Sequence, residues 1–279
     1  MPTLRQRASS ASAETRDLWS SISAAVGYPY STLYTAELLP PLPYRGPYTD
    51  PHQWPRVAVV ASSDPVDVAL SMQSSERLGY PSRVAVLNTA NEKTPGGQWE
   101  GAVFAPEEAL ARRSNLVQAL TTDEDGNDAT HVHYPLPEKG GLFSPRVAII
   151  RGGPEQNYAL WDEKEWRSVS VISVAPVRRP KVDETGSVYS FPQERELQRE
   201  KMRAVLRMAA YQGIADVCLS PFGCGCSSYR NPVEEVCQIW RELLLTRGDE
   251  FDGWFRNVVF AVADGKGEHN WDVFMRYFG

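Results

Sequence analysis

The sequence predicts an α/β fold in which a largely parallel sheet is covered by helices on both sides. Short runs rich in Val and Ile recur after residue 55, and near-continuous apolar runs are typical of strands buried on both faces. Helical patterns separate these runs, and strand–helix alternation is typical of parallel sheets. The expected strands are 56–61, 83–87, 146–151, 168–174, 216–220 and 257–262, and the expected helices are 65–78, 106–120, 193–212, 232–245 and 269–278.

An extension precedes this core. Leu18, Ile22 and Val26 recur at a spacing of four, which predicts a helix over 13–26 whose Ser- and Ala-rich outer end frays. Residues 39–55 hold six prolines and predict an extended loop over the core, because proline fits neither helix interiors nor central strands. A proline-rich partner motif is the weaker alternative. The aromatic residues expected to anchor the loop are Tyr44, Tyr48 and Trp54.

Two of the expected helices begin at recognisable start signals. Asp64 is a good N-cap and Pro65 follows it at the first helical position. Asn231 and Pro232 form a similar start, so we interpret the acids that follow them, Glu234 and Glu235, as structural. The remaining long segments, 152–166 and 178–191, are interpreted as surface excursions of a single domain over residues 1–279, with 1–55 as its extension.

Composition excludes several classes of protein. A net charge of −6 argues against a broad nucleic-acid surface, so no direct DNA binding is expected. No apolar run is long enough to cross a membrane or to form a secretory signal, which predicts a cytoplasmic or nuclear protein. The four cysteines fall within twenty residues, as expected of reduced thiols. Cys224 and Cys226 have no nearby His pair, so no metal and no cofactor are expected.

Two glycine-containing loops follow expected strands. The first carries Gly96 and Gly97, and the second carries Gly223, Cys224 and Gly225. Ligands of open α/β sheets bind beyond the carboxyl ends of strands, where backbone N–H groups of such loops can converge on a phosphate. Each loop alone is equally typical of a tight turn. Together they predict a site that holds a diphosphate from two sides.

Two adjacent acids open the helix after the first loop. Glu107 and Glu108 follow Pro106, an arrangement that a helix start favours on dipole grounds alone. The functional alternative is an acid beside a reacting bond. Adjacent helical residues diverge by about 100°, so we expect one to point at a bond while the other reaches a flanking hydroxyl or solvent. Asn88 and Asn91, just past the strand, serve either a turn or a sugar.

These motifs resemble the microbial-type poly(ADP-ribose) glycohydrolases, a branch of the macrodomain superfamily, over residues 13–279. The first motif runs from Asn88 through Asn91, Pro95, Gly96 and Gly97 to Gln98, continues with Gly101-Ala102, and ends with Pro106-Glu107-Glu108. The second is Gly223-Cys224-Gly225 followed by Arg230-Asn231-Pro232, and the third is 258–264 with Asn270 and Phe274. Gln98 stands where the family has a third glycine, and Pro106 where it has glutamine.

The resemblance implies a macrodomain-like three-layer α/β/α sandwich with a mostly parallel mixed sheet and an N-terminal extension. It implies a monomeric hydrolase of ADP-ribosyl glycosidic links, principally the ribose–ribose bond of poly(ADP-ribose), and a place in the DNA damage response. Glu108 matches the family's catalytic acid and Glu107 its ribose-orienting partner. The implied substrate-binding residues are Asn91, Gly96, Gly97, Gln98, Gly223, Cys224, Gly225 and an aromatic residue, Tyr229 or its competitor Phe222.

Three functions stay open at this point. The first is hydrolysis, either of the polymer or of ADP-ribose joined to an acceptor protein. The second is a reader that holds ADP-ribose without cleaving it, which Gln98 and Pro106 favour. The third, a Rossmann-type nucleotide enzyme, is disfavoured because no G-x-G-x-x-G follows the first clear strand. Since no basic track is evident for a polyanion, we expect recognition of one terminal ADP-ribose unit.

Overall fold

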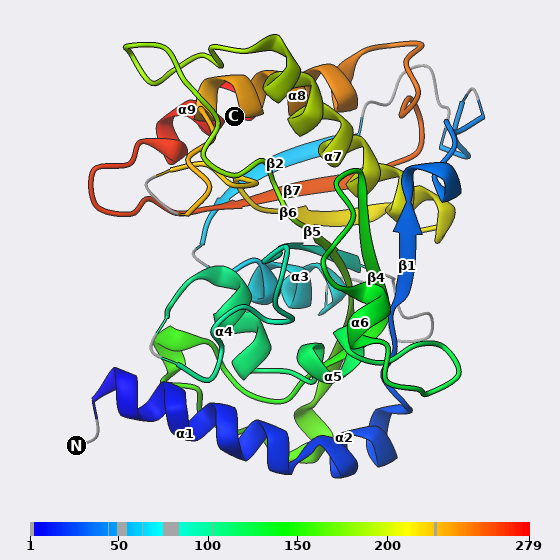
Figure 1. Cartoon of the computed structure of the whole chain (residues 1–279), viewed down its shortest axis with the longest axis vertical. Coiled ribbons are helices and arrows are strands. Elements are labelled where there is room, and N and C mark those ends of the chain that lie inside the picture. The colour runs from blue at the N-terminus through cyan, green and yellow to red at the C-terminus, as the bar shows by residue number, and fades with distance from the viewer. Residues whose placement is uncertain are drawn as a thin grey trace.

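A computed structural model describes residues 3–43, 45–48, 55–62, 64–74, 84–101, 103–225 and 228–279. Within these residues a seven-stranded sheet has the order β1-β4-β5-β3-β6-β7-β2 (Figure 1). Five neighbouring strands are parallel: β5 (Arg167–Val174), β3 (Val84–Thr89), β6 (Asp216–Leu219), β7 (Asn257–Val262) and β2 (Arg56–Ala61). All five were expected, so the parallel part of the sheet is confirmed.

The other two strands make the sheet mixed. β4 (Gly140–Ile149) runs antiparallel to β5, and β1 (Thr32–Thr35) runs antiparallel to β4 at the edge. The run expected at 146–151 therefore covers only the last four residues of this ten-residue strand and extends two residues beyond its end. Its register shifts between Ser144 and Val147, around Pro145, which has no N–H to donate to the ladder. β1 was not predicted.

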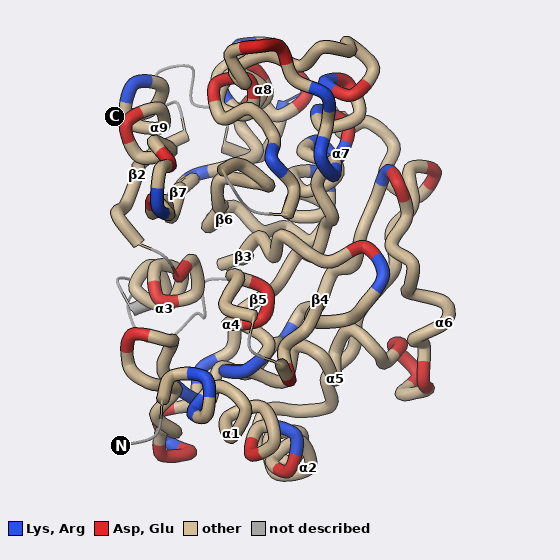
Figure 2. Tube along the Cα trace, turned by 60° about the vertical axis from the view of Figure 1, so that its left-hand side comes forward, with Lys and Arg blue, Asp and Glu red and all other residues tan. Residues whose placement is uncertain are grey.

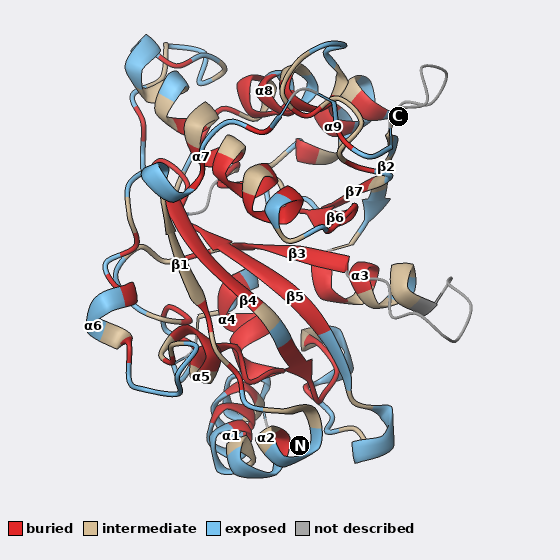
Figure 3. Ribbon diagram, turned by 90° about the vertical axis from the view of Figure 1, so that its right-hand side faces the viewer, coloured by how far each residue is buried: buried red, intermediate tan, exposed pale blue. Residues whose placement is uncertain are grey.

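Helices cover both faces of the sheet, as expected (Figures 1 and 3). Side chains alternate along β3, so that Ala85 and Leu87 join one apolar cluster while Val84 and Val86 join the other. The first cluster is closed by α7 (Pro192–Tyr211), α8 (Val233–Leu245) and α9 (Asn270–Phe278). The second is closed by α3 (Pro65–Ser74), α4 (Pro106–Arg112) and α5 (Leu116–Leu120), and α6 (Thr130–His133) is a single turn nearby. The three-layer α/β/α arrangement is confirmed.

The helix expected over 106–120 is two helices. Ser114 forms a bridge with Ile149 of β4, and the side-chain oxygen of Asn115 accepts from the backbone N–H of Ala148 at 2.8 Å. The segment between α4 and α5 thus pairs with β4 instead of continuing the helix. Pairing with β4 interrupts a segment whose local pattern is helical throughout.

The N-terminal extension forms two helices rather than one, α1 (Leu4–Asp17) and α2 (Trp19–Val26). The expectation that its outer end frays is wrong. Thr3 and Gln6 form a capping box at the start of α1, and Ala8 and Ala11 pack on Tyr158. Tyr158 belongs to the 152–166 segment, which contains the short helices η2 (Pro154–Gln156) and η3 (Glu163–Glu165).

The proline-rich segment lies over the core where it is described. After η1 (Ala36–Leu38), Leu39 and Leu42 are buried against the α7 side. Tyr48 is 41% exposed and stacks under the guanidinium of Arg256, so it is a partial anchor only. Tyr44 and Trp54 lie outside the described residues. Among the helices that the structure describes, none combines the length and apolarity needed to cross a membrane.

Candidate active site

The two predicted loops lie side by side at the carboxyl ends of neighbouring strands. The first follows β3, the second follows β6, and these strands pair directly. The hydroxyls of Thr89 and Ser220, at the starts of the two loops, lie 3.1 Å apart. Tyr229, near the end of the second loop, donates its hydroxyl to the carbonyl of Ala90 at 2.6 Å. The structure therefore brings together the two loops that the sequence predicted as one site.

Glu107 is buried and ties the start of α4 to the end of β3. It is only 4% exposed. The backbone N–H of Asn91 donates to its Oε2 at 2.7 Å, and the side-chain amide of Asn88 donates to its Oε1 at 3.4 Å. Asn88 in turn donates to the hydroxyl of Ser173 on β5 at 3.1 Å. Both carboxylate oxygens of Glu107 thus have partners in the protein.

Glu108 is equally buried, at 7% exposure, but only one of its oxygens has a partner. The backbone N–H of Gln98 donates to Oε1 at 3.1 Å. Oε2 is enclosed and meets no hydrogen-bond partner within the described part of the chain. A buried carboxylate oxygen without a partner costs free energy, and such atoms in folded proteins call for an explanation. Oε2 of Glu108 is therefore the oxygen of this pair whose hydrogen-bonding capacity the described residues leave unused.

Both carboxylates converge on Gly97. This glycine has φ +59°, and a Cβ placed on it would lie 2.4 Å from Oε1 of Glu108 and 3.2 Å from Oε2 of Glu107. Neither acid points to solvent, so of the two alternatives for the second acid only the flanking hydroxyl stays open. The glycine allows the loop backbone to approach both acids, which no larger residue could do.

The remaining residues of the first loop make contacts that hold the loop in its own conformation. Gly96, at φ +70°, leaves room for Val117, whose Cγ2 would lie 2.5 Å from an added Cβ. The N–H of Gly97 bonds the carbonyl of Thr94 at 3.0 Å. Asn91 accepts the N–H groups of Lys93 and Thr94 on its side-chain oxygen. Part of the hydrogen-bonding capacity that the sequence assigned to a ligand is thus used inside the loop.

Burial raises the pKa of Glu107 to about 8, and the charge of Glu108 adds to this effect. The donors Asn91, Asn88 and Gly96 act in the opposite direction. Glu107 therefore favours its protonated form near neutral pH. The raised pKa favours Glu107 as the proton carrier, whereas the free oxygen favours Glu108. The two observations therefore favour different members of the pair.

Tyr134 is a site residue that the sequence did not single out. It is 7% exposed, and its hydroxyl has no partner among the described residues. Burial and the nearby Glu107 and Tyr229 raise its pKa well above the ordinary value of 10, so the hydroxyl keeps its proton. Tyr134 follows α6 in a stretch without any motif. A single sequence holds no signal that it reaches the acid pair.

In the second loop, Gly223 and Gly225 also have positive φ, at +78° and +84°. A Cβ on Gly223 would lie 2.8 Å from the side-chain amide of Asn231, which donates to the carbonyls of Val177 and Gly223. A Cβ on Gly225 would lie 2.3 Å from Oε1 of Glu268. Glu268 was not predicted, and its carboxylate opposes an anion at this loop. Cys224 is buried and its N–H bonds the carbonyl of Pro221.

The two aromatic candidates differ in position. Phe222 is fully buried, and its ring packs on Trp240 at 6.3 Å between centroids. Its side chain is a core residue, which is the other alternative for a ring beside a glycine loop. Tyr229 is half-buried and joins the two loops. Cys226 and Ser227 lie outside the described residues, and among the residues that are described no three His, Cys, Asp or Glu side chains are grouped to hold a metal.

Comparison with known proteins agrees with the sequence motifs. The sequence model of microbial-type PARG, catalytic domain, matches residues 24–152, which include the first loop and both acids. The poly(ADP-ribose) glycohydrolase of Thermomonospora curvata has a TM-score of 0.76 at 22% identity, over 97% of this chain and 99% of that one. Its complex with the inhibitor ADP-HPD has a TM-score of 0.73 at 22% identity, over 96% and 98%.

A second bacterial protein is also similar. The poly(ADP-ribose) glycohydrolase of Deinococcus radiodurans in complex with ADP-ribose has a TM-score of 0.61 at 26% identity, over 84% of this chain and 86% of that one. No curated protein sequence matches the chain. The family match and the shared fold confirm the resemblance to the microbial-type poly(ADP-ribose) glycohydrolases, with their macrodomain-like architecture.

Proposed function

We propose that this relative of the microbial-type poly(ADP-ribose) glycohydrolases is itself a glycosidase that cleaves the ribose–ribose O-glycosidic bond at a terminal unit and releases ADP-ribose. One observation carries the proposal. Glu108 has a buried carboxylate oxygen with no partner among the described residues, beside a second buried acid, at the carboxyl end of the sheet. The family match covers this segment, and a relative with 26% identity has been solved with ADP-ribose.

The chemistry follows from the pair. When the bond between the anomeric carbon and the leaving oxygen breaks, charge develops on both, and a proton must reach the oxygen. We assign that proton transfer to Oε2 of Glu108. Water then attacks the anomeric carbon and returns its proton to the carboxylate, so the acid is regenerated. Glu107, fixed by Asn91 and Asn88, holds the reacting ribose in place.

The residues that we assign to substrate binding lie on the two glycine-containing loops. Asn91 and Gln98 lie at the first loop beside Gly96 and Gly97, and we assign the ribose and the near phosphate to this side. Gly223, Cys224 and Gly225 form the opposite side, and Tyr229 joins the two. The single domain of residues 1–279, a monomeric state and the cytoplasmic or nuclear location with its link to DNA damage remain predictions.

A reader without turnover is the second candidate, and two observations favour it. The side chain of Gln98 is exposed at the loop where the family has glycine, and Glu268 places a carboxylate beside Gly225. Both oppose a closely held diphosphate. Hydrolysis of mono-ADP-ribosylated proteins is the third, because the acid pair does not distinguish the acceptor.

Paired measurements separate these candidates. ADP-ribose binding is measured by calorimetry, and turnover of poly(ADP-ribose) and of mono-ADP-ribosylated protein is measured for wild type and Glu108→Ala. If the protein is a hydrolase, both wild type and Glu108→Ala should bind ADP-ribose, and wild type alone should turn over the substrate. Binding without turnover selects the reader, turnover that survives Glu108→Ala removes the assigned acid, and absence of binding removes both.

Chain length and salt test the terminal-unit preference. A chain of net charge −6 shows mixed charges along its described course (Figure 2), and the arginines of α7 are paired with glutamates. Affinity should therefore not rise with polymer length. A steep salt dependence that grows with length would instead indicate contacts to several consecutive units.

A further inference from the structure

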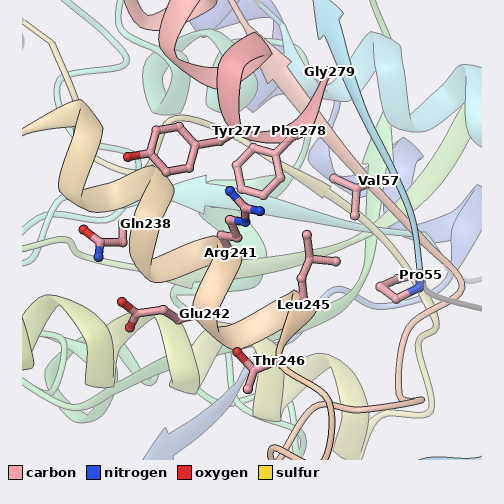
Figure 4. A pocket seen from close by; sticks show the side chains of 10 residues that line it. All are labelled: Pro55, Val57, Gln238, Arg241, Glu242, Leu245, Thr246, Tyr277, Phe278 and Gly279. Atoms are coloured by element: carbon pink, nitrogen blue, oxygen red, sulfur yellow. The ribbon is translucent and has the colours of Figure 1, made fainter.

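A pocket of about 840 Å³ lies at the amino end of strand β2, whereas the acid pair lies at the carboxyl end of β3. It is lined by the start of β2, the last turns of α8 and the end of α9 (Figure 4). The acids stand where β3 ends, whereas Val57 stands where the parallel strand β2 begins. The pocket is therefore separate from the proposed active site, and its volume falls within the range of about 300–1,000 Å³ typical of small-molecule sites.

Arg241 of α8 is exposed and gives this pocket a positive charge that is not paired with a carboxylate of the described residues. Its guanidinium makes no hydrogen bond or ion pair with the described residues and extends toward the rings of α9 (Figure 4). The neighbouring Glu242 does not neutralise it, because that carboxylate accepts from Arg195 and Arg199 of α7 at 3.2 and 2.6 Å. Each of the other helix arginines packed in this layer has a carboxylate: Arg195, Arg199, Arg203, Arg207 and Arg276.

The other walls mix apolar and aromatic side chains with polar ones in similar measure, the polar ones being Gln238, Glu242 and Thr246. Val57 and Leu245 are partly buried, and Phe278 is 9% exposed. The ring and hydroxyl of Tyr277 lie on one side, and the hydroxyl of Thr246 lies below (Figure 4). A cation beside apolar and aromatic side chains, with polar groups around them, fits a ligand with a flat apolar body and one negative charge.

We propose that this pocket binds a small aromatic carboxylate, whose carboxylate pairs with Arg241 and whose ring lies against Val57, Leu245 and Phe278. The two oxygens of a carboxylate match the paired N–H groups of a guanidinium. In a chain of net charge −6 an unpaired cation inside a concave surface attracts an anion locally. The proposal does not depend on glycosidase activity.

The probes are 1-naphthoate and its uncharged counterpart 1-naphthamide, titrated by calorimetry into the full chain. Wild type should bind naphthoate about tenfold or more tightly than naphthamide, since charge-assisted hydrogen bonds exceed neutral ones. Arg241→Gln should reduce that ratio to near one. Leu245→Asn should weaken both probes and leave the ratio unchanged, because it removes apolar wall and no charge.

Arg5→Gln is the matched control, because Arg5 is an exposed arginine of α1 that also makes no hydrogen bond or ion pair with the described residues. It should bind both probes as wild type does. The proposal is overturned if wild type binds neither probe, if it binds both equally, or if the ratio survives Arg241→Gln. A dimer in native mass measurements that Arg241→Gln dissociates would instead assign the pocket to a second copy of the chain.

Discussion

The indole of Trp19 stacks on the indole of Trp99, with 6.2 Å between ring centroids and 18° between planes. This contact joins the N-terminal helix α2 to the residue next to Gln98. The hydroxyl of Ser12 on α1 donates to the carbonyl of Trp99 at 2.7 Å, and the guanidinium of Arg112 donates to the same carbonyl at 2.8 Å. The extension therefore fixes the segment whose backbone N–H bonds Glu108.

Trp19→Ala should lower kcat about tenfold and change ADP-ribose affinity much less. The loss of the stack loosens the segment that orients Glu108, and small misplacements of a catalytic group are costly. Steady-state kinetics with poly(ADP-ribose) give kcat, and calorimetry with ADP-ribose gives the affinity. Trp271→Ala is the control, because Trp271 is also partly buried but packs on the α7–α9 side. An equal fall in kcat for both variants would indicate a general loss of stability and would exclude a specific effect of the Trp19 stack on Glu108.

The raised pKa of Glu107 predicts a pH dependence of stability. The folded pKa, about 8, lies above the ordinary value of 4.5, so folding favours the protonated acid. Between about pH 4.5 and 8 the folded state keeps this proton while the unfolded state has lost it, so stability falls as pH rises, by the order of 1 kcal/mol per pH unit. Denaturant unfolding of wild type and Glu107→Gln should show this difference growing across the window.

Glu163→Gln makes the same chemical change at an exposed position of η3 and serves as the control. Its difference from wild type should stay constant with pH. A constant difference for Glu107→Gln as well would mean that the folded protein does not favour the protonated acid.

Tyr229→Phe should weaken ADP-ribose binding about threefold to tenfold. The hydroxyl-to-carbonyl bond from Tyr229 to Ala90 joins the two loops, and one hydrogen bond contributes about 1 kcal/mol. The fold should be kept, since the ring remains. Tyr211→Phe removes a similar bond, to the carbonyl of Pro40 at 3.0 Å, away from the site. Calorimetry that shows unchanged affinity for Tyr229→Phe would exclude a role for the bond in placing the loops.

Much of this architecture follows from local pattern. The parallel strands are continuous apolar runs, and a strand followed by glycine and then by acids at a helix start is readable as a candidate site. β1 was missed because its four residues are all partly buried and show no alternation. The break between α4 and α5 was missed because it depends on Ser114 and Asn115 meeting β4, which no local signal encodes.

The site shows the same division. That Glu107 and Glu108 belong to it was predictable from their place after the first loop. That both converge on Gly97 was not, because side-chain torsions outweigh the 100° between adjacent helical positions. The position of Phe222 could not be decided from the sequence, because a ring beside a glycine loop suits either contact with a ligand or packing in the core. Glu268 approaches Gly225 from a distant segment, so only the fold reveals it.

Gly97→Ala should be more destabilising than a glycine substitution at a comparable backbone angle. Gly97 has φ +59° and a Cβ there would lie 2.4 Å from Glu108, whereas Gly213 has φ +64° with no atom within 4 Å. Gly213→Ala thus measures backbone strain alone, about 1–2 kcal/mol. The excess for Gly97→Ala, measured by denaturant unfolding, reports the clash with the carboxylate.

Removing the carboxylate should remove that excess. In the double variant Gly97→Ala with Glu108→Ala, the additional cost of the Gly97 change should fall to the value for Gly213→Ala, giving a coupling of about 1 kcal/mol or more between neighbouring residues. Pairing Gly97→Ala with Glu163→Ala should show no coupling, because Glu163 is exposed on η3. If the Glu108 and Glu163 pairs behave alike, Gly97 is required by its turn alone and not by the approach of the acid.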